Sequence, residues 1–141
     1  MKHANWLVVV SLVVLSGMAA AQMSSSSRIV AQVPFEFMVA NKIVPAGECD
    51  VRVATMDGKT LSIRNVGSKV SLFSYSPQTE DKQAAAHYAL VFEKYGDRYF
   101  LSGIKLEGSK IGYRLLESKL EAELRAQNVP ATEETVLAFL E

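Results

Sequence analysis

The residues of this chain that could do nucleophilic or metal chemistry are few. The sequence holds one cysteine, Cys49, and two histidines, His3 and His87. Zinc sites need three or four Cys, His or carboxylate ligands. His3 lies within the first 21 residues, which are predicted below to be removed. The one remaining histidine and the one cysteine cannot supply a soft-ligand set. His87 lies between Ala86 and Tyr88, outside any G-x-S-x-G turn, and the sequence contains no P-loop or dinucleotide-binding fingerprint. The sequence therefore predicts no catalytic residue, no metal site and no cofactor.

Cys49 lies in a segment, Glu48 to Val53, whose odd positions are apolar and whose even positions are charged. This alternation predicts a buried Cys49, because free cysteine is among the most buried residue types. An intermolecular disulfide and a reactive thiol are the alternatives. Two acidic neighbours, Glu48 and Asp50, oppose the lowered pKa that thiol reactivity needs.

Aromatic residues form the other conspicuous group, between Phe92 and Phe100. Their rings could stack on sugars or pack against lipids, or they could simply build the core through cross-strand pairs. Tyr95 flanks the turn at Gly96-Asp97, where its hydroxyl could stay in contact with water. The predicted ligand contacts are therefore Tyr95 and Tyr99.

The first 21 residues have the layout of a secretory signal peptide. A basic start at Lys2 precedes the apolar run Trp6 to Leu15 and the small-residue site Ala19-Ala20-Ala21. An uncleaved anchor helix is the alternative, but the run is short for a bilayer, which needs about 20 apolar residues. Cleavage between Ala21 and Gln22 is expected, so we predict an exported, periplasmic or extracellular protein.

Charge and composition limit the partners of the processed chain. Removal of Lys2 takes one of the fifteen basic residues and none of the fifteen acids, which leaves a net charge of about minus one. Lys and Arg are spread singly, so nucleic acid is not an expected partner. No remaining apolar run is long enough for stable membrane insertion. The expected partner is an unknown envelope or extracellular ligand, and the oligomeric state is left open.

Four regions follow from these patterns. Residues 1–21 form the signal peptide, residues 22–28 a flexible Ser-rich leader, and residues 29–127 a β domain with a C-terminal helix. Residues 128–141 form a C-terminal tail. The tail is either a short helix capped by Thr132 or an added edge strand, and the helix is favoured.

Period-two patterns predict the strands of the domain. Val33 to Val39 alternates but is broken, or placed at an edge, by Pro34. Two segments, Glu48 to Thr55 and Lys59 to Asn65, are joined by a three-residue loop with Gly58 left-handed. This loop sets Val53 against Leu61 and Val51 against Ile63, so that one apolar face is shared.

A second hairpin is predicted further along the chain. Ala84 to Tyr95, whose alanines could also begin with a helical turn, is joined to Arg98 to Lys105 by a type II′ turn at Gly96-Asp97. In this register Ile104 lies on the face opposite Leu90. Ser76 to Gln83 is predicted to be a surface loop suited to recognition.

The pattern changes to helical spacing between Tyr113 and Gln127. Leu116, Leu120 and Leu124 recur on one face, and this face is expected to cover the sheet. The predicted fold is therefore mainly β: a single antiparallel sandwich or partly open barrel with a C-terminal α-helix.

Three short motifs carry a family resemblance. VPFEF begins at Val33, PAGE begins at Pro45, and YGDRYFL begins at Tyr95. Together they resemble a group of small exported bacterial all-β proteins of unknown function, over residues 31 to about 125. An aromatic residue usually follows the PAG turn in that group, so Cys49 is a departure. The resemblance implies an exported β domain and supplies no activity, cofactor or site.

The expected function is that of an exported, non-enzymatic binding or scaffolding module. The alternative is a small hydrolase or isomerase that uses His87 or a carboxylate. Four acidic residues on the strands, Glu36, Asp50, Glu93 and Asp97, are interpreted as ordinary polar-face residues.

Overall fold

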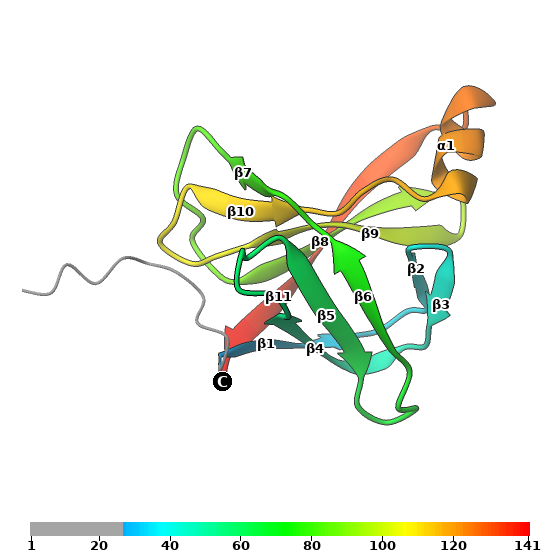
Figure 1. The fold of residues 1–141 in the computed structure, drawn as a ribbon. Coiled ribbons are helices and arrows are strands. Elements are labelled where there is room, and N and C mark those ends of the chain that lie inside the picture. The colour runs from blue at the N-terminus through cyan, green and yellow to red at the C-terminus, as the bar shows by residue number, and fades with distance from the viewer. Residues whose placement is uncertain (1–26) are drawn as a thin grey trace, which may run out of the picture.

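The computed structural model describes residues 27–141 as one curled, open β-sheet, a half-barrel with a single short helix at one end (Figure 1). The mainly β, partly open barrel with a C-terminal helix is thus confirmed. The predicted cleavage at Ala21–Gln22, the signal peptide and most of the leader lie outside the described residues. Arg28, assigned to the leader, is instead the first residue of a strand.

Eleven strands and one helix make up the described chain. In chain order they are β1 (Arg28–Val33), β2 (Phe37–Val39), β3 (Lys42–Val44), β4 (Gly47–Val53), β5 (Thr60–Asn65), β6 (Ser71–Tyr75), β7 (Gln78–Glu80), β8 (Ala89–Tyr95), β9 (Arg98–Lys105), β10 (Ile111–Arg114), α1 (Lys119–Ala126) and β11 (Ala131–Leu140). The sheet order is β3-β2-β9-β8-β11-β1-β4-β5-β6, and β10 pairs with both β9 and β7.

The β4–β5 hairpin has the predicted register. Val51 pairs with Ile63 and Val53 with Leu61, and Gly58 has a φ of +71° in the connecting loop. Glycine adopts this left-handed conformation without a steric penalty because it has no Cβ atom. The chain breaks between β1 and β2 at Pro34, one of the two outcomes that the proline allowed.

The β8–β9 hairpin has the predicted turn but a different register beyond it. Tyr95 pairs with Arg98, and Gly96 has a φ of +64°. Ser102 is then an extra residue, because Phe92 pairs with Leu101 while Val91 pairs with Gly103. Such a bulge shifts every later residue to the other face. The prediction that Ile104 and Leu90 lie on opposite faces is therefore wrong, since they pair and are both in the core.

The C-terminal tail is a strand, so the favoured helix is wrong. β11 is not an edge strand either, because it pairs with β8 on one side and β1 on the other. Thr132, expected to be a helix cap, pairs with Lys94. The cause is tertiary: β1 and β8 each present a free edge, and their backbone groups are satisfied only by a strand between them.

The helix is present, but it covers only the sheet at Tyr95, near the β8–β9 turn, and not through the predicted leucine face. α1 runs from Lys119 to Ala126 and stands at one end of the half-barrel, beside the β8–β9 turn (Figure 1). Leu116 precedes the helix and is 59% exposed, whereas the neighbouring Leu115 is buried. Leu120 and Leu124 are half-buried, so the predicted leucine face is not a docked face.

The inner face of the curled sheet holds the core, which is filled without help from the helix. Its largest fully buried side chains include Ile29, Phe37 and Phe92. The predicted surface loop, Ser76 to Gln83, contains the short strand β7, which pairs with β10. Ala84 to Tyr88 precede β8 as a connection, so the strand is shorter than predicted.

Cys49 is buried in this core at 1% exposure, as predicted. Burial and the neighbouring Asp50 carboxylate raise the pKa of its thiol to about 12, and a backbone hydrogen bond from Arg64 opposes them. At pH 8 the reactive thiolate is therefore scarce. Native-state labelling with a maleimide is expected to be at least about a hundredfold slower than labelling in denaturant. Equal rates in the two conditions would contradict the assigned faces of β4.

Candidate functional site

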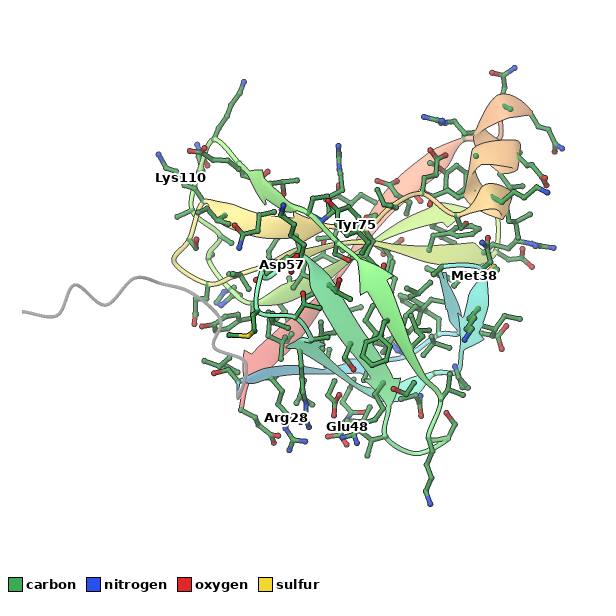
Figure 2. The ribbon with its side chains drawn as sticks, in the orientation of Figure 1. Arg28, Met38, Glu48, Asp57, Tyr75 and Lys110 are labelled. Atoms are coloured by element: carbon green, nitrogen blue, oxygen red, sulfur yellow. The ribbon has the colours of Figure 1, made fainter. Side chains whose placement is uncertain are left out.

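The candidate site is a groove of about 470 Å³ at the end of the half-barrel where the β8–β9 turn meets the β2–β3 hairpin. Figure 2 labels Met38 in this region, on β2. We call it the Phe35 groove. Its lining comes from two stretches distant in sequence, residues 35–43 and 97–99: Phe35, Glu36, Phe37, Met38, Ile43, Asp97, Arg98 and Tyr99. The volume falls within the range of small-molecule sites, about 300–1,000 Å³.

Two stacked aromatic rings form the floor of the Phe35 groove. The Phe35 and Tyr99 ring centroids lie 3.7 Å apart with an interplanar angle of 12°. Phe35 also meets the buried Phe92 edge-on, with centroids 4.9 Å apart. Such ring pairs add about 0.5–1.5 kcal/mol beyond their area burial. Both Phe35 and Tyr99 are half-buried, so the stack is held by the core while part of its surface meets solvent.

Charged groups border the aromatic floor. Glu36, Asp97 and Arg98 are exposed, and Lys94 Nζ lies 5.3 Å from the Tyr99 ring centroid. Two carboxylates and two cations supply both hydrogen-bond acceptors and donors around an apolar centre. The lining contains no Ser, Cys or His, so the groove offers recognition chemistry and no obvious nucleophile.

Local backbone geometry fixes the apolar wall of the Phe35 groove. Ala40 and Asn41, between β2 and β3, have φ values of +49° and +64°, the two positive values of a type I′ turn. This tight turn holds Met38 opposite Ile43. Asn41 Oδ1 accepts a hydrogen bond of 3.1 Å from the Lys119 backbone N–H, which ties the turn to the first residue of α1.

The structure separates the two tyrosines that the sequence analysis predicted as ligand contacts. Tyr99 lies in the Phe35 groove. Tyr95 is only 7% exposed, so the expectation of a hydroxyl in water is wrong. It meets Phe100 edge-on at 5.6 Å, and its hydroxyl donates a 3.3 Å hydrogen bond to Glu121 of α1. The helix covers this tyrosine because Asn128, left-handed at φ +57°, turns the chain directly back into β11.

Sequence analysis missed Phe35, Glu36 and Arg98 as site residues. All three belong to the VPFEF and YGDRYFL motifs, which were interpreted as strand patterns and as carriers of a family resemblance that supplies no site. Their convergence depends on the parallel contact between β2 and β9, where Met38 faces Phe100. A useful signal was available, because charged residues adjoin aromatic residues in both motifs.

Glu121 is a buried carboxyl group with an unusual environment. Burial is the largest cause that raises its pKa above the ordinary value of glutamate, followed by the Glu117 charge, while the Tyr95 hydrogen bond lowers it. Its backbone N–H is bonded to Ser118 Oγ, the helix N-cap. The pKa of Tyr95 is raised as well, first by burial and then by Glu121.

The raised pKa of Glu121 should make the free energy of unfolding depend on pH. Because the pKa of Glu121 is raised in the folded state, its stabilising contribution is complete below the unfolded value and is lost as pH rises through the folded value. We expect Glu121→Gln to unfold at a higher temperature than wild type at pH 7 and to show a flatter profile from pH 4 to 7. Thermal scans across that range test this, with Glu123→Gln on the exposed side of α1 as the control. A lower melting temperature for Glu121→Gln at pH 7 would contradict the buried-acid assignment.

His87 lies in a separate groove of about 520 Å³ between the 81–86 connection and β11. Its side chain is 65% exposed, and Nδ1 is 3.7 Å from Glu107 Oε1. Thr135 supplies the one hydroxyl in the lining of that groove, and within the described chain it makes no hydrogen bond to His87. A histidine paired with an acid but not with a nucleophile gives no support for a catalytic triad.

A third groove, of about 490 Å³, holds a close pair of acids. Glu93 of β8 and Glu133 of β11 are directly cross-strand partners, and both line this groove with Arg114. The pKa of Glu93 is raised, first by burial and then by the Glu133 charge, while Arg114 lowers it. Like charges directly opposite one another destabilise a sheet, so this pair is costly to the fold.

A fourth cluster of charges is structural. The Asp50 side chain is 2% exposed and lies within 4 Å of three arginines, Arg52 on its own strand and Arg28 and Arg64 on the two neighbouring strands. Arg64 donates to Asp50 Oδ2 at 2.6 and 3.2 Å, while Arg28 and Arg52 lie farther away, at 3.7 and 3.6 Å. Arg28 also pairs with Glu141 beside the end of β11. A buried carboxylate needs such partners, and these bind β1, β4 and β5 together.

Over residues 27–141 the structure contains no helix long and apolar enough to cross a membrane. The same residues include no group of three or more His, Cys, Asp or Glu side chains placed to hold a metal ion. Comparison of the chain with protein-family models, with curated proteins and with solved structures finds no match. The geometry of the grooves is therefore the basis for an assignment of function.

Proposed function

We propose that the protein is an exported, non-enzymatic binding module whose Phe35 groove takes a polyhydroxylated ligand, such as a short saccharide. The observation that carries this proposal is the stacked pair Phe35–Tyr99 at the floor of a groove bordered by charged groups. A ring stack offers a flat apolar surface for the C–H face of a sugar. Carboxylates and a guanidinium group beside it offer acceptors and donors for sugar hydroxyls.

The rest of the groove supports the same ligand class. The net charge of Glu36, Asp97, Arg98 and Lys94 is zero at neutral pH, which suits an uncharged ligand. Met38 and Ile43 provide an apolar wall at one side. The export of the protein is a proposal that rests on the signal-peptide pattern of residues 1–21.

A glycan array with the processed chain, followed by calorimetry on the best ligand, tests the binding proposal. Tyr99→Ala is expected to weaken binding at least about tenfold, because it removes half of the ring stack. Tyr75→Ala is the matched control, since Tyr75 is 50% exposed on β6, away from the groove. Asp97→Asn, at an exposed position, tests the polar border without disturbing the core.

Two further samples in the same binding experiment test whether a histidine or a metal ion takes part. His87→Ala and treatment with EDTA should leave binding unchanged within about twofold, because the lining of the Phe35 groove includes no histidine and the described residues include no group of three metal-ligating side chains. If no glycan binds, or if Tyr99→Ala and Tyr75→Ala have equal effects, the proposal is wrong.

The pair Glu93–Glu133 favours a second candidate function, the carboxylate-assisted hydrolysis of a glycosidic bond. Enzymes of this kind pair a carboxyl group of raised pKa, which acts as the general acid, with an ionised carboxylate. The raised pKa of Glu93 fits the acid, and Glu133 would be its partner. Chromogenic glycosides, tested with wild type, Glu93→Gln and Glu133→Gln, decide this candidate. Turnover that both variants abolish would establish hydrolysis, and turnover in none of a broad panel would remove this candidate.

A further inference from the structure

The sheet of the described chain has three free edges, and one of them is unprotected. β3 is three residues long, contains Lys42 and is followed by Pro45. β7 is also three residues long, follows Pro77 and ends in Glu80. β6 is longer, with the sequence Ser-Leu-Phe-Ser-Tyr, and has neither a charged residue nor a proline. Short strands, charges and prolines are the usual means of preventing edge-to-edge pairing, and β6 uses none of them.

The backbone of β6 leaves three residues available for pairing. The Val70 carbonyl accepts from Asn65 N–H, and Ser76 N–H donates to the Lys59 carbonyl. Antiparallel ladders alternate between bonded and non-bonded pairs, so Leu72 and Ser74 also bond toward β5. The N–H and C=O groups of Ser71, Phe73 and Tyr75 therefore point away from β5, toward the open edge. None of the other described strands pairs with β6 there.

The side chains of the same residues are apolar and exposed. Phe73 is 68% and Tyr75 is 50% exposed on the outer face of the sheet, and Figure 2 labels Tyr75 at the end of β6. Leu72 and Ser74 point inward and are buried. The edge thus presents backbone groups that pair with no other described strand, beside two aromatic rings; the Tyr75 carbonyl accepts only a 3.5 Å hydrogen bond from Ser74 Oγ.

We propose that β6 pairs antiparallel with β6 of a second copy of this chain, about a two-fold axis at Phe73. In this register Phe73 faces Phe73 of the partner subunit, and Ser71 faces Tyr75 of the partner subunit. All the paired residues belong to the outward-bonding set, so the ladder would gain about six backbone hydrogen bonds. A shift by one residue would oppose an outward-bonding residue to an inward-bonding one and break the ladder.

Self-complementarity is what selects a second copy over another extended peptide. An isologous interface needs a patch that matches itself after a two-fold rotation, and β6 does so at the centre of its own length. The rotation places Phe73 and Tyr75 of both copies in one continuous aromatic strip, because all four side chains are on the outer face. The formal net charge of the processed chain is only about minus one, so long-range repulsion between the two copies is small.

The expected dimer is weak, because a five-residue edge falls well short of the area of about 1,200–2,000 Å² typical of stable interfaces. Sedimentation velocity over a concentration series of the processed chain, up to about 1 mM, should show a monomer–dimer equilibrium. Phe73→Lys is expected to raise the dissociation constant at least about tenfold, since two lysines would oppose each other at the axis.

Phe139→Lys is the matched control, because Phe139 is 72% exposed on β11, in the interior of the sheet order. It should change the dissociation constant by less than about twofold. Equal weakening by both variants would mean that exposed aromatics associate non-specifically, and the β6 proposal would be wrong.

Cysteine cross-linking tests the register itself. A mixture of Ser71→Cys and Tyr75→Cys chains should form a disulfide-linked heterodimer on mild oxidation, because facing residues have Cα atoms within about 6 Å. Each variant alone should not, because its two cysteines would lie about 14 Å apart along the antiparallel pair. Cross-linking of either variant alone at the same rate, or a monomer at every concentration, would overturn the proposal. A monomer that binds extended peptides at β6 would assign the edge to another partner.

Discussion

Removal of residues 131–141, which include the whole of β11, is expected to leave a chain that does not fold. β11 pairs with β8 over seven residues and with β1 over three, so it joins the two parts of the sheet. Without β11, the edges of β8 and β1 lose their partner strand. The core also loses Ala138, a β11 residue that is 4% exposed. Unsatisfied backbone groups and exposed apolar surface act in the same direction. Circular dichroism and amide dispersion in NMR spectra should show an unfolded chain.

The control for this truncation keeps the β11 backbone and changes only outward side chains. Leu137→Thr and Phe139→Thr replace exposed residues with a strand-forming polar one and should retain cooperative unfolding. A truncated chain that still unfolds cooperatively would contradict the role of β11 as the strand that joins the sheet.

Phe92→Ala is expected to destabilise the domain by about 3–5 kcal/mol, the range for truncation of a fully buried phenylalanine. Phe92 is completely buried, and its ring meets Phe35 at 4.9 Å and Phe37 at 5.0 Å. Loss of this ring leaves a cavity beneath the floor of the Phe35 groove. Urea denaturation measures the change in the free energy of unfolding.

The same substitution links the core to the groove. The Phe35 ring packs edge-on against the Phe92 ring, which holds it in place. Ligand affinity should therefore fall in Phe92→Ala even where the protein remains folded. Phe139→Ala, at a position 72% exposed, should stay within about 0.5 kcal/mol of wild type. A loss of less than about 1 kcal/mol in Phe92→Ala would contradict the aromatic core described here.

Local patterns were sufficient to predict the hairpins. The β4–β5 register follows from two short-range requirements, a left-handed Gly58 and a shared apolar face, and both lie within about fifteen residues of sequence. The β8–β9 turn follows likewise from Gly96 and Asp97. The bulge at Ser102 could not be predicted in this way. The Ser102 hydroxyl donates to the Val91 carbonyl within the hairpin, but the Ser102 carbonyl accepts from Leu115 N–H, which lies after β10 and outside the hairpin.

The state of the C-terminal region depends on tertiary contacts that no local pattern encodes. Ala131 to Leu140 carries residues compatible with either helix or strand, and the free edges of β1 and β8 decide between them. The burial of Tyr95 also depends on a tertiary contact, because the hydrogen bond from its hydroxyl to Glu121 holds α1 against it. Of the residues that line the Phe35 groove, Tyr99 is the one predicted as a ligand contact, and that role stays a prediction; Phe35 reaches the groove only through the β2–β9 contact.

The central claim is that the Phe35 groove is the binding surface. The most direct test is a two-dimensional NMR titration of the processed, isotope-labelled chain with the saccharides that score highest on a glycan array. The account predicts shift changes concentrated at Phe35, Asp97, Arg98 and Tyr99, with β6 and the surroundings of His87 unchanged. Saturable shift changes centred on Glu93 and Glu133, or on His87, without shift changes in the Phe35 groove would contradict the claim.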